Sequence, residues 1–155
     1  MKRAAFALIS LFAACAWPTL AQTMDPKSDD PKLHALLARL PNKRWRPVTY
    51  ERGVLHSFDS QRAKRAGDKV DVWERQDYYE VDRTYGGPID RLLAHMTIDC
   101  SEMKTRVSSL ILYLRGEVKK EYSMPADVEW KELPTGSVIE DFATKVCKAV
   151  PARSE

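Results

Sequence analysis

The stretch Leu92-Leu93-Ala94-His95-Met96-Thr97-Ile98-Asp99-Cys100 decides the fold of this chain. Its apolar side chains recur at every second position, which is the pattern of a β-strand with one buried face. The residues of this apolar face are Leu92, Ala94, Met96, Ile98 and Cys100. Cys100 is therefore expected to point into the core.

A second cysteine lies on the apolar face of a predicted C-terminal helix. Ser137 and Glu140 have the spacing of a capping box, in which each residue satisfies a backbone N–H at the start of a helix. Apolar residues then recur at helical spacing, and they include Cys147. The pattern predicts a helix over residues 137–149 that docks on the sheet beside Leu92–Cys100.

Cys100 and Cys147 are the two cysteines that remain when residues 1–21 are set aside. Because both point into the same interior, the sequence predicts a disulfide, which would stabilise the fold by about 4 kcal/mol. Two free buried thiols and an intermolecular bond are the alternatives. A zinc site is not expected, because the cysteines lack CxxC spacing and the histidines do not cluster.

The middle of the chain reads as short β segments separated by glycine-containing turns. The predicted strands are Trp45–Glu51, Val54–Asp59, Lys69–Tyr79, Leu92–Ser101, Lys104–Arg115 and Glu117–Ser123. Their close spacing leaves no room for crossover helices, so the sheet should be antiparallel. We expect an α+β fold, with an antiparallel sheet of about six strands, the C-terminal helix on one face and a Cys100–Cys147 disulfide.

The strand Lys104–Arg115 is apolar on both sides. Strict alternation assigns Val107, Ile111 and Tyr113 to one face and Leu110, Leu112 and Leu114 to the other. Such a strand needs cover on both faces. The second cover is expected to be either the helix that contains Leu33–Leu40 or another copy of the chain, and a homodimer is therefore a further prediction.

The first residues have the features of a secretory signal peptide over 1–21. Lys2 and Arg3 precede an apolar run that is too short to span a membrane, and a small-residue exit ends at Ala21. A lipoprotein signal processed at Cys15 is the alternative, and only then would the chain be attached to a membrane. Residues 22–44 should form a linker and a short amphipathic helix that begins at Pro31, and residues 45–150 a single domain.

The overall charge argues against nucleic-acid binding. The chain has 25 Lys+Arg and 22 Asp+Glu, and removal of residues 1–21 leaves 23 against 22, a net charge of +1. A nucleic-acid-binding domain usually keeps a larger basic excess. One basic run nevertheless forms a candidate binding patch for an acidic protein or glycan, with a solvated loop as the alternative. Its residues are Lys43, Arg44, Arg46, Arg62, Lys64 and Arg65.

No catalytic or cofactor motif is recognisable. His95 and Asp99 share a strand face, but they lie about 13 Å apart, far beyond hydrogen-bond reach. His34 and His56 are isolated and are expected at the surface. At least two of Trp45, Trp73 and Trp130 are expected to pack in the core. The sequence therefore predicts no enzyme, no metal site and no cofactor.

Several short motifs along the chain resemble those of the surface-adhesin protein E family of Gram-negative bacteria. In order they are Val72-Trp73, Ile98-Asp99-Cys100 with Lys104 and Arg106, Tyr113, Gly116, Trp130, Pro134-Thr135-Gly136-Ser137 and Val146-Cys147. The resemblance covers Trp45 to Lys148. It implies an antiparallel sheet with a C-terminal helix and a tendency to dimerise. The best-known member of the family is a surface lipoprotein that binds host matrix and serum proteins such as laminin and vitronectin.

These observations predict an exported, non-enzymatic binding protein that contacts host or envelope macromolecules. Its expected location is the periplasm, the outer membrane or the cell surface of a Gram-negative bacterium. A structural or accessory protein of a periplasmic envelope complex is the main alternative, with the leucine-rich helix docking on a partner. A small periplasmic hydrolase is a third hypothesis.

Overall fold

The computed structural model describes residues 28–41 and 43–151. The predicted signal peptide and Cys15 lie outside the described residues. The elements, in chain order, are α1 (Pro31–Leu37), β1 (Trp45–Glu51), β2 (Val54–Asp59), β3 (Lys64–Ala66), β4 (Lys69–Asp82), β5 (Ile89–Asp99), β6 (Lys104–Leu114), β7 (Glu117–Ser123), β8 (Lys131–Glu132) and α2 (Val138–Ala149).

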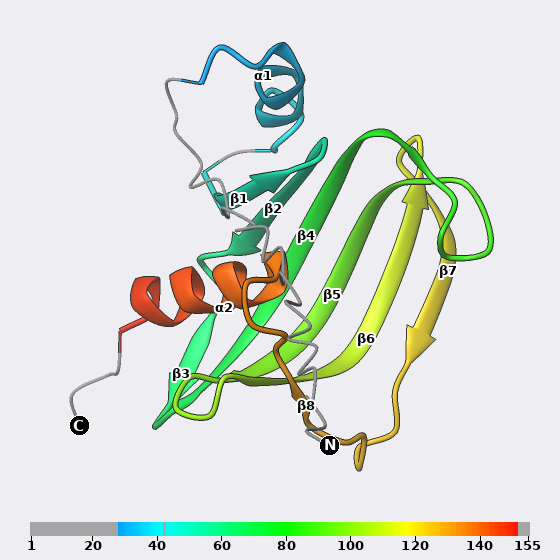
Figure 1. Cartoon of the computed structure of the whole chain (residues 1–155). Helices are drawn as coiled ribbons and strands as arrows, with labels where there is room; N and C mark the ends of the chain where they lie inside the picture. Colours follow the sequence, from blue (N-terminus) through cyan, green and yellow to red (C-terminus); the bar gives the residue numbers. More distant parts are fainter. Residues whose placement is uncertain (1–27, 42, 152–155) are drawn as a thin grey trace, which may run out of the picture.

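The strands form one antiparallel sheet with the order β1-β2-β4-β5-β6-β7, while β3 pairs with β4 and β8 pairs with β6. Figure 1 shows β4, β5 and β6 as long curved strands with α2 lying across one side of the sheet. The predicted α+β fold is confirmed, and all six predicted strands are present. The two additional strands, β3 and β8, contain only three and two residues, which is too short to produce an alternating pattern.

The helix α2 covers one side of the sheet, which we call the core face. Phe142, Ala143 and Val146 of this helix are fully buried against apolar side chains of β2, β4 and β5. Ser137 caps the helix by accepting a hydrogen bond from the backbone N–H of Glu140. The Glu140 carboxylate accepts from the backbone N–H of Gly136, so the cap closes one residue earlier than a standard capping box.

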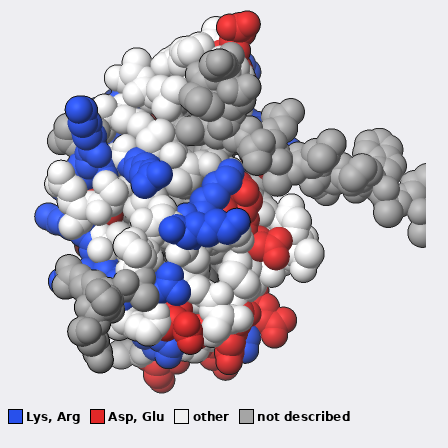
Figure 2. Space-filling model, turned by 90° about the vertical axis from the view of Figure 1, so that its left-hand side faces the viewer, with Lys and Arg blue, Asp and Glu red and all other residues white. Residues whose placement is uncertain are grey.

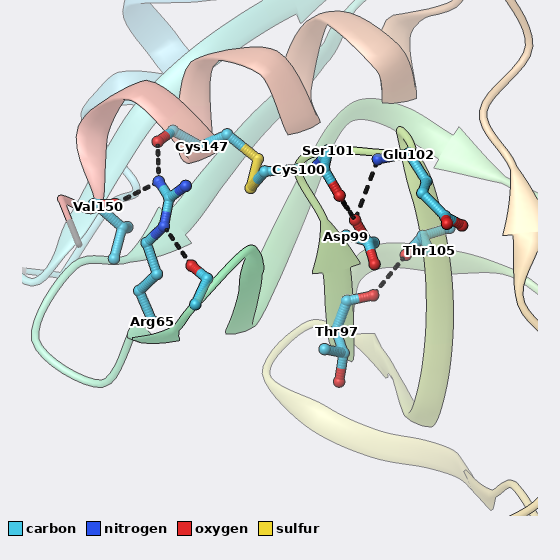
Figure 3. Close-up of a disulfide and its surroundings, with 10 residues drawn as sticks. Arg65, Thr97, Asp99, Cys100, Ser101, Glu102, Thr105, Cys147 and Val150 are labelled. Carbon is cyan, nitrogen blue, oxygen red and sulfur yellow. Dashed lines mark hydrogen bonds between the residues drawn. A yellow bond between two sulfur atoms is a disulfide. The ribbon is translucent and has the colours of Figure 1, made fainter.

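A disulfide joins Cys100, directly after β5, to Cys147 on α2, with 5.9 Å between the two Cα atoms. This confirms the predicted pairing. Figure 3 shows the bond beside the turn that follows β5. In that turn the Asp99 carboxylate accepts hydrogen bonds from the Ser101 hydroxyl and from the backbone of Ser101 and Glu102. These bonds, led by the Ser101 hydroxyl, lower the pKa of Asp99.

A second, smaller cluster lies on the opposite side of the sheet, which we call the outer face. Leu33 and Leu36 of α1 are buried there against Leu55 of β2. Asp30 caps α1 through the backbone N–H of Lys32 and also accepts a hydrogen bond from the Tyr50 hydroxyl on β1. Burial and this hydrogen bond raise the pKa of Tyr50 to about 12. The helix forms where the leucine spacing predicts it and covers one end of the outer face.

The pairing of β5 with β6 shifts by one residue at Ser108. His95 pairs with Ser109, but Met96 pairs with Val107, so Ser108 is the extra residue of a β-bulge. A bulge reverses the parity of the strand beyond it. The predicted face of Val107 is therefore wrong: Val107 packs toward the core face, whereas Ile111 and Tyr113 lie on the outer face.

The two edge strands of the sheet, β1 and β7, are protected in different ways against pairing with the edge of another molecule. Six of the seven residues of β7 are exposed, and four of them are charged. β1 contains Pro47, and its register with β2 shifts between Pro47 and Thr49. Thr49 is buried and donates its hydroxyl hydrogen bond to Asp141 of α2 at 2.6 Å.

Candidate binding surface

The outer face is the candidate binding surface, because away from α1 its side chains are only partly buried. Strand parity explains the difference from the core face: Val72, Met96 and Leu112 are buried, whereas their neighbours along each strand are accessible. The accessible side chains of the outer face are Asp71, Trp73, Leu93, His95, Thr97, Arg106, Ile111 and Tyr113.

Trp45, Trp73 and Trp130 lie on this surface and not in the core, which corrects the expectation for them. Trp73 is partly buried and stacks on His95, with 4.8 Å between ring centroids and 20° between ring planes. Trp130 lies near two cations, Lys69 and Arg106. Trp45 lies between the guanidinium groups of Arg44 and Arg75, each 5.7 Å from its ring. All three rings therefore contact polar or charged neighbours.

A buried ion-pair network crosses the outer face near α1. Arg75 on β4 forms two hydrogen bonds to Asp77, at 2.6 and 2.8 Å, and both residues are almost fully buried. Arg91 on β5 lies 3.5 Å from the same carboxylate and places its guanidinium 5.2 Å from the Tyr113 ring. Two arginines thus share one carboxylate, so this part of the surface carries an excess of positive charge.

Two residues of the predicted basic patch are drawn together by a buried carboxylate. Asp59, which is 0% exposed, pairs with Arg44 and lies 4.0 Å from Arg62. Its other oxygen accepts hydrogen bonds from the backbone of Gln61 and Arg62. The hydrogen bond to Asp59 raises the pKa of Arg44. Asp59 therefore organises the turn after β2.

The other four patch residues point in different directions. Arg65 donates to the carbonyl oxygens of Cys147 and Val150 at the end of α2 (Figure 3). Lys64 is on the opposite side of β3, next to Asp71. Lys43 and Arg46 are exposed before and within β1. The structure thus does not gather all six residues around one point, and whether any of them binds a partner stays a prediction.

The side of the molecule that carries the C-terminal end of α2 is shown in Figure 2. Basic side chains are spread across the middle of this side, and acidic side chains lie along its lower and right margins. A partner approaching from this direction would meet scattered positive charge and no single basic cluster. This pattern favours a weak, salt-sensitive contact over tight recognition.

A chain of three polar side chains on the outer face was missed at the sequence level. His95 Nε2 lies 3.1 Å from Asp71, and His95 Nδ1 lies 2.8 Å from the Ser108 hydroxyl. The Ser108 hydroxyl also lies within hydrogen-bond distance of the His95 carbonyl oxygen. These residues come from three neighbouring strands, so no linear motif could reveal them. Asp71 and Ser108 are well exposed to water, which weakens this chain as catalytic machinery.

His56 is buried in the core, which corrects the prediction that it lies at the surface. Its Nδ1 atom lies 2.7 Å from the carboxylate of Glu74, which is 1% exposed. Glu74 also accepts from Gln76, and Gln76 in turn accepts from the Tyr78 hydroxyl. Burial raises the pKa of Tyr78. This chain of polar side chains lies beneath α2, and His56 at one end of it is buried. We therefore assign it a structural role.

The described residues contain neither a group of three metal-binding side chains nor a helix long and apolar enough to cross a membrane. Comparison with protein-family models matches residues 45–148 to surface-adhesin protein E. The match confirms the resemblance and covers about two thirds of the chain. Comparisons with curated proteins and with solved structures find no match.

Proposed function

Because the chain belongs to the surface-adhesin protein E family, we propose that it is an exported, non-enzymatic binding protein that contacts host or envelope macromolecules. Membership of the family indicates an exported or surface-exposed protein. The proposed partner is a protein or an acidic glycan, and the proposed contact is made by the outer face.

One observation supports this use of the outer face: it holds aromatic rings and arginines, partly accessible, on a sheet that the disulfide and α2 keep rigid. Trp73 lies on β4 and Tyr113 on β6, the two strands that flank β5, and Arg91 of β5 lies against Tyr113. Tryptophan, tyrosine and arginine contribute most of the energy in many interfaces. A rigid surface also loses little conformational entropy on binding.

Binding to immobilised matrix and serum proteins tests this proposal. We expect the double substitution Trp73→Ala/Tyr113→Ala to weaken binding by more than about tenfold, because it removes two interface anchors. Tyr85→Ala is the matched control, since Tyr85 is an exposed aromatic residue in the β4–β5 loop. Equal binding by the two variants, with unchanged folding by circular dichroism, would rule out the outer face as the contact.

Cell fractionation with protease treatment of intact cells tests where the protein acts. We expect the protein at the exterior of the outer membrane, so that added protease removes it from intact cells. Protection from protease, with release by osmotic shock, would place it in the periplasm and exclude host adhesion. Labelling with radioactive palmitate would show whether Cys15 carries lipid.

The accessory-protein alternative relied on the leucines of α1 docking on a partner. Leu33 and Leu36 are 2% and 0% exposed because they pack on Leu55 of the same chain. That packing leaves them unavailable to another protein. Deletion of residues 31–41 should therefore lower the stability of the protein and leave any co-purifying partner in place.

The Asp71–His95–Ser108 chain is the observation that a hydrolase would need. The Ser108 hydroxyl lies at one nitrogen of the His95 imidazole, and the Asp71 carboxylate lies at the other. Nucleophilic catalysis uses an arrangement of this kind. We expect no hydrolysis of p-nitrophenyl acetate above the buffer rate, because water has free access to Ser108. A rate that Ser108→Ala abolishes would overturn this and identify a nucleophile.

A further inference from the structure

A groove that includes charged side chains opens at the end of the outer face away from α1. Its volume is about 350 Å³, and β3, β4 and β5 line it. Strand pairing places Lys64 opposite Asp71, Asp71 opposite Thr97 and Thr97 opposite Arg106. These four residues therefore form one row across four strands, with Lys69 in the next row.

The groove carries more positive than negative charge. The Lys64 side chain makes no hydrogen bond or ion pair with any described residue, and Lys64 is exposed. The carboxylate within the row, Asp71, is already engaged by His95. Lys104, two residues before Arg106 on β6, is paired with Glu102 and contributes little free charge. The cations that can meet a ligand are Lys64, Lys69 and Arg106, and Asp99 lies opposite Lys69 in the strand register.

Trp130 holds two of these cations in place. Lys69 Nζ lies 5.2 Å and Arg106 Cζ lies 5.1 Å from the centre of its ring, within the range of a cation–π interaction. Long basic side chains usually lose rotational freedom when they bind an anion. Here the ring has already restricted them, so the groove is prepared for a negatively charged group.

The size of the row selects the kind of ligand. The backbones of Lys64 and Arg106 are separated by three strand spacings, or about 14 Å. A chain with repeated anionic groups can place a separate group on each of these cations. The Thr97 hydroxyl and the Asp71 carboxylate lie between the cations and can bond to sugar hydroxyls. A purely anionic ligand would be repelled by Asp71.

We propose that this groove binds a linear sulfated polysaccharide, with sulfate groups on Lys64, Lys69 and Arg106 and sugar hydroxyls on Thr97 and Asp71. The inference rests on the proposed binding function and names its ligand class. Two residues of the patch predicted from sequence line the groove, Lys64 and Arg65. The Arg65 guanidinium already donates to the carbonyl oxygens at the end of α2, so we do not assign it a sulfate group.

Calorimetry with heparin, and salt elution from a heparin column, test the proposal. We expect the wild-type protein to bind heparin and Lys64→Ala/Lys69→Ala to bind at least about tenfold more weakly and to elute at lower salt. The matched control is Lys119→Ala/Lys120→Ala on β7, which removes the same charge away from the groove. This control should bind as the wild type does.

Three results would overturn the inference. One is the absence of heparin binding by the wild type. Another is an equal loss in the groove and β7 variants, which would show a response to net charge alone. The third is equally tight binding of fully desulfated heparin or of a single-stranded oligonucleotide. If the protein still binds immobilised matrix proteins in these cases, the proposed binding function stands and only the glycan site fails.

Discussion

Arg65 on β3 donates a hydrogen bond of 2.9 Å to the carbonyl oxygen of Cys147, the residue whose sulfur forms the disulfide with Cys100. A second bond from the same nitrogen reaches Val150. The last carbonyl groups of a helix lack partners within the helix and carry partial negative charge. Arg65 supplies both hydrogen bonds and positive charge to them. The end of α2 is therefore attached to the sheet by both a covalent bond and an arginine.

The covalent attachment is expected to be the larger of the two. Cys100→Ala/Cys147→Ala should lower the free energy of unfolding by about 4 kcal/mol, because the unfolded chain regains the freedom of a loop of 47 residues. Urea denaturation measures this loss. Wild-type protein reduced with dithiothreitol should unfold at the same urea concentration as the variant. An unchanged midpoint in both would show that α2 stays docked without the bond.

The arginine attachment is expected to contribute less. Arg65→Ala should lower the free energy of unfolding by about 1–2 kcal/mol, since two charge-assisted hydrogen bonds at a helix end are lost. Hydrogen exchange should accelerate at the last turn of α2. Arg62→Ala is the control, because it removes the same charge three residues earlier, where the side chain is exposed. Equal losses in the two variants would contradict a specific role for Arg65.

The buried pair His56–Glu74 is expected to matter more when broken than when replaced. His56→Ala should cost about 3 kcal/mol, because it removes a main partner of a buried carboxylate. Replacing both residues by leucine should recover most of that loss, since no charge is then left in the core. A double-mutant cycle by chemical denaturation measures the coupling. Purely additive losses in this cycle would show that His56 and Glu74 do not stabilise the fold as a pair.

The contact between Tyr50 and Asp30 makes the docking of α1 sensitive to alkaline pH. The pKa of Tyr50 is raised from about 10 in the unfolded chain to about 12 in the fold. The folded state therefore favours the neutral phenol, and this stabilisation is present below pH 10 and is lost between about pH 10 and 12. Burial also raises the pKa of Tyr78 and Tyr85, so absorbance at 295 nm should show several late-titrating tyrosines, and Tyr50→Phe should remove the one near pH 12. Loss of a normally titrating tyrosine would contradict the contact.

Most of the fold could be predicted from the sequence, because its long elements each carry a complete pattern. Alternation placed Cys100 on the core face, and helical spacing placed Cys147 on the apolar face of α2. The bulge at Ser108 could not be seen in the same way. An extra residue in one strand is set by its pairing with the neighbouring strand, so strict alternation assigned Val107 to the wrong face.

The candidate surface was harder to predict, because its groups come from strands that are distant in sequence. Asp71 reaches His95 across 24 residues, and Arg65 reaches α2 across 82. The local sequence His56-Ser57-Phe58 does not reveal that His56 is buried, because that burial depends on its contact with Glu74 in another strand. A run of basic residues in a loop also has the same sequence pattern whether its side chains face solvent or a buried carboxylate such as that of Asp59.

The two edge strands restrict how copies of this chain can associate. An exposed strand edge can pair with the edge of another molecule and so begin an open-ended polymer. Charged side chains along β7 disfavour such pairing, and Pro47 removes a hydrogen-bond donor from β1. We therefore expect a dimer of this chain to use a sheet face. A twofold-symmetric contact of that kind closes at two copies, and it would let the protein reach high local density on a surface without forming fibres.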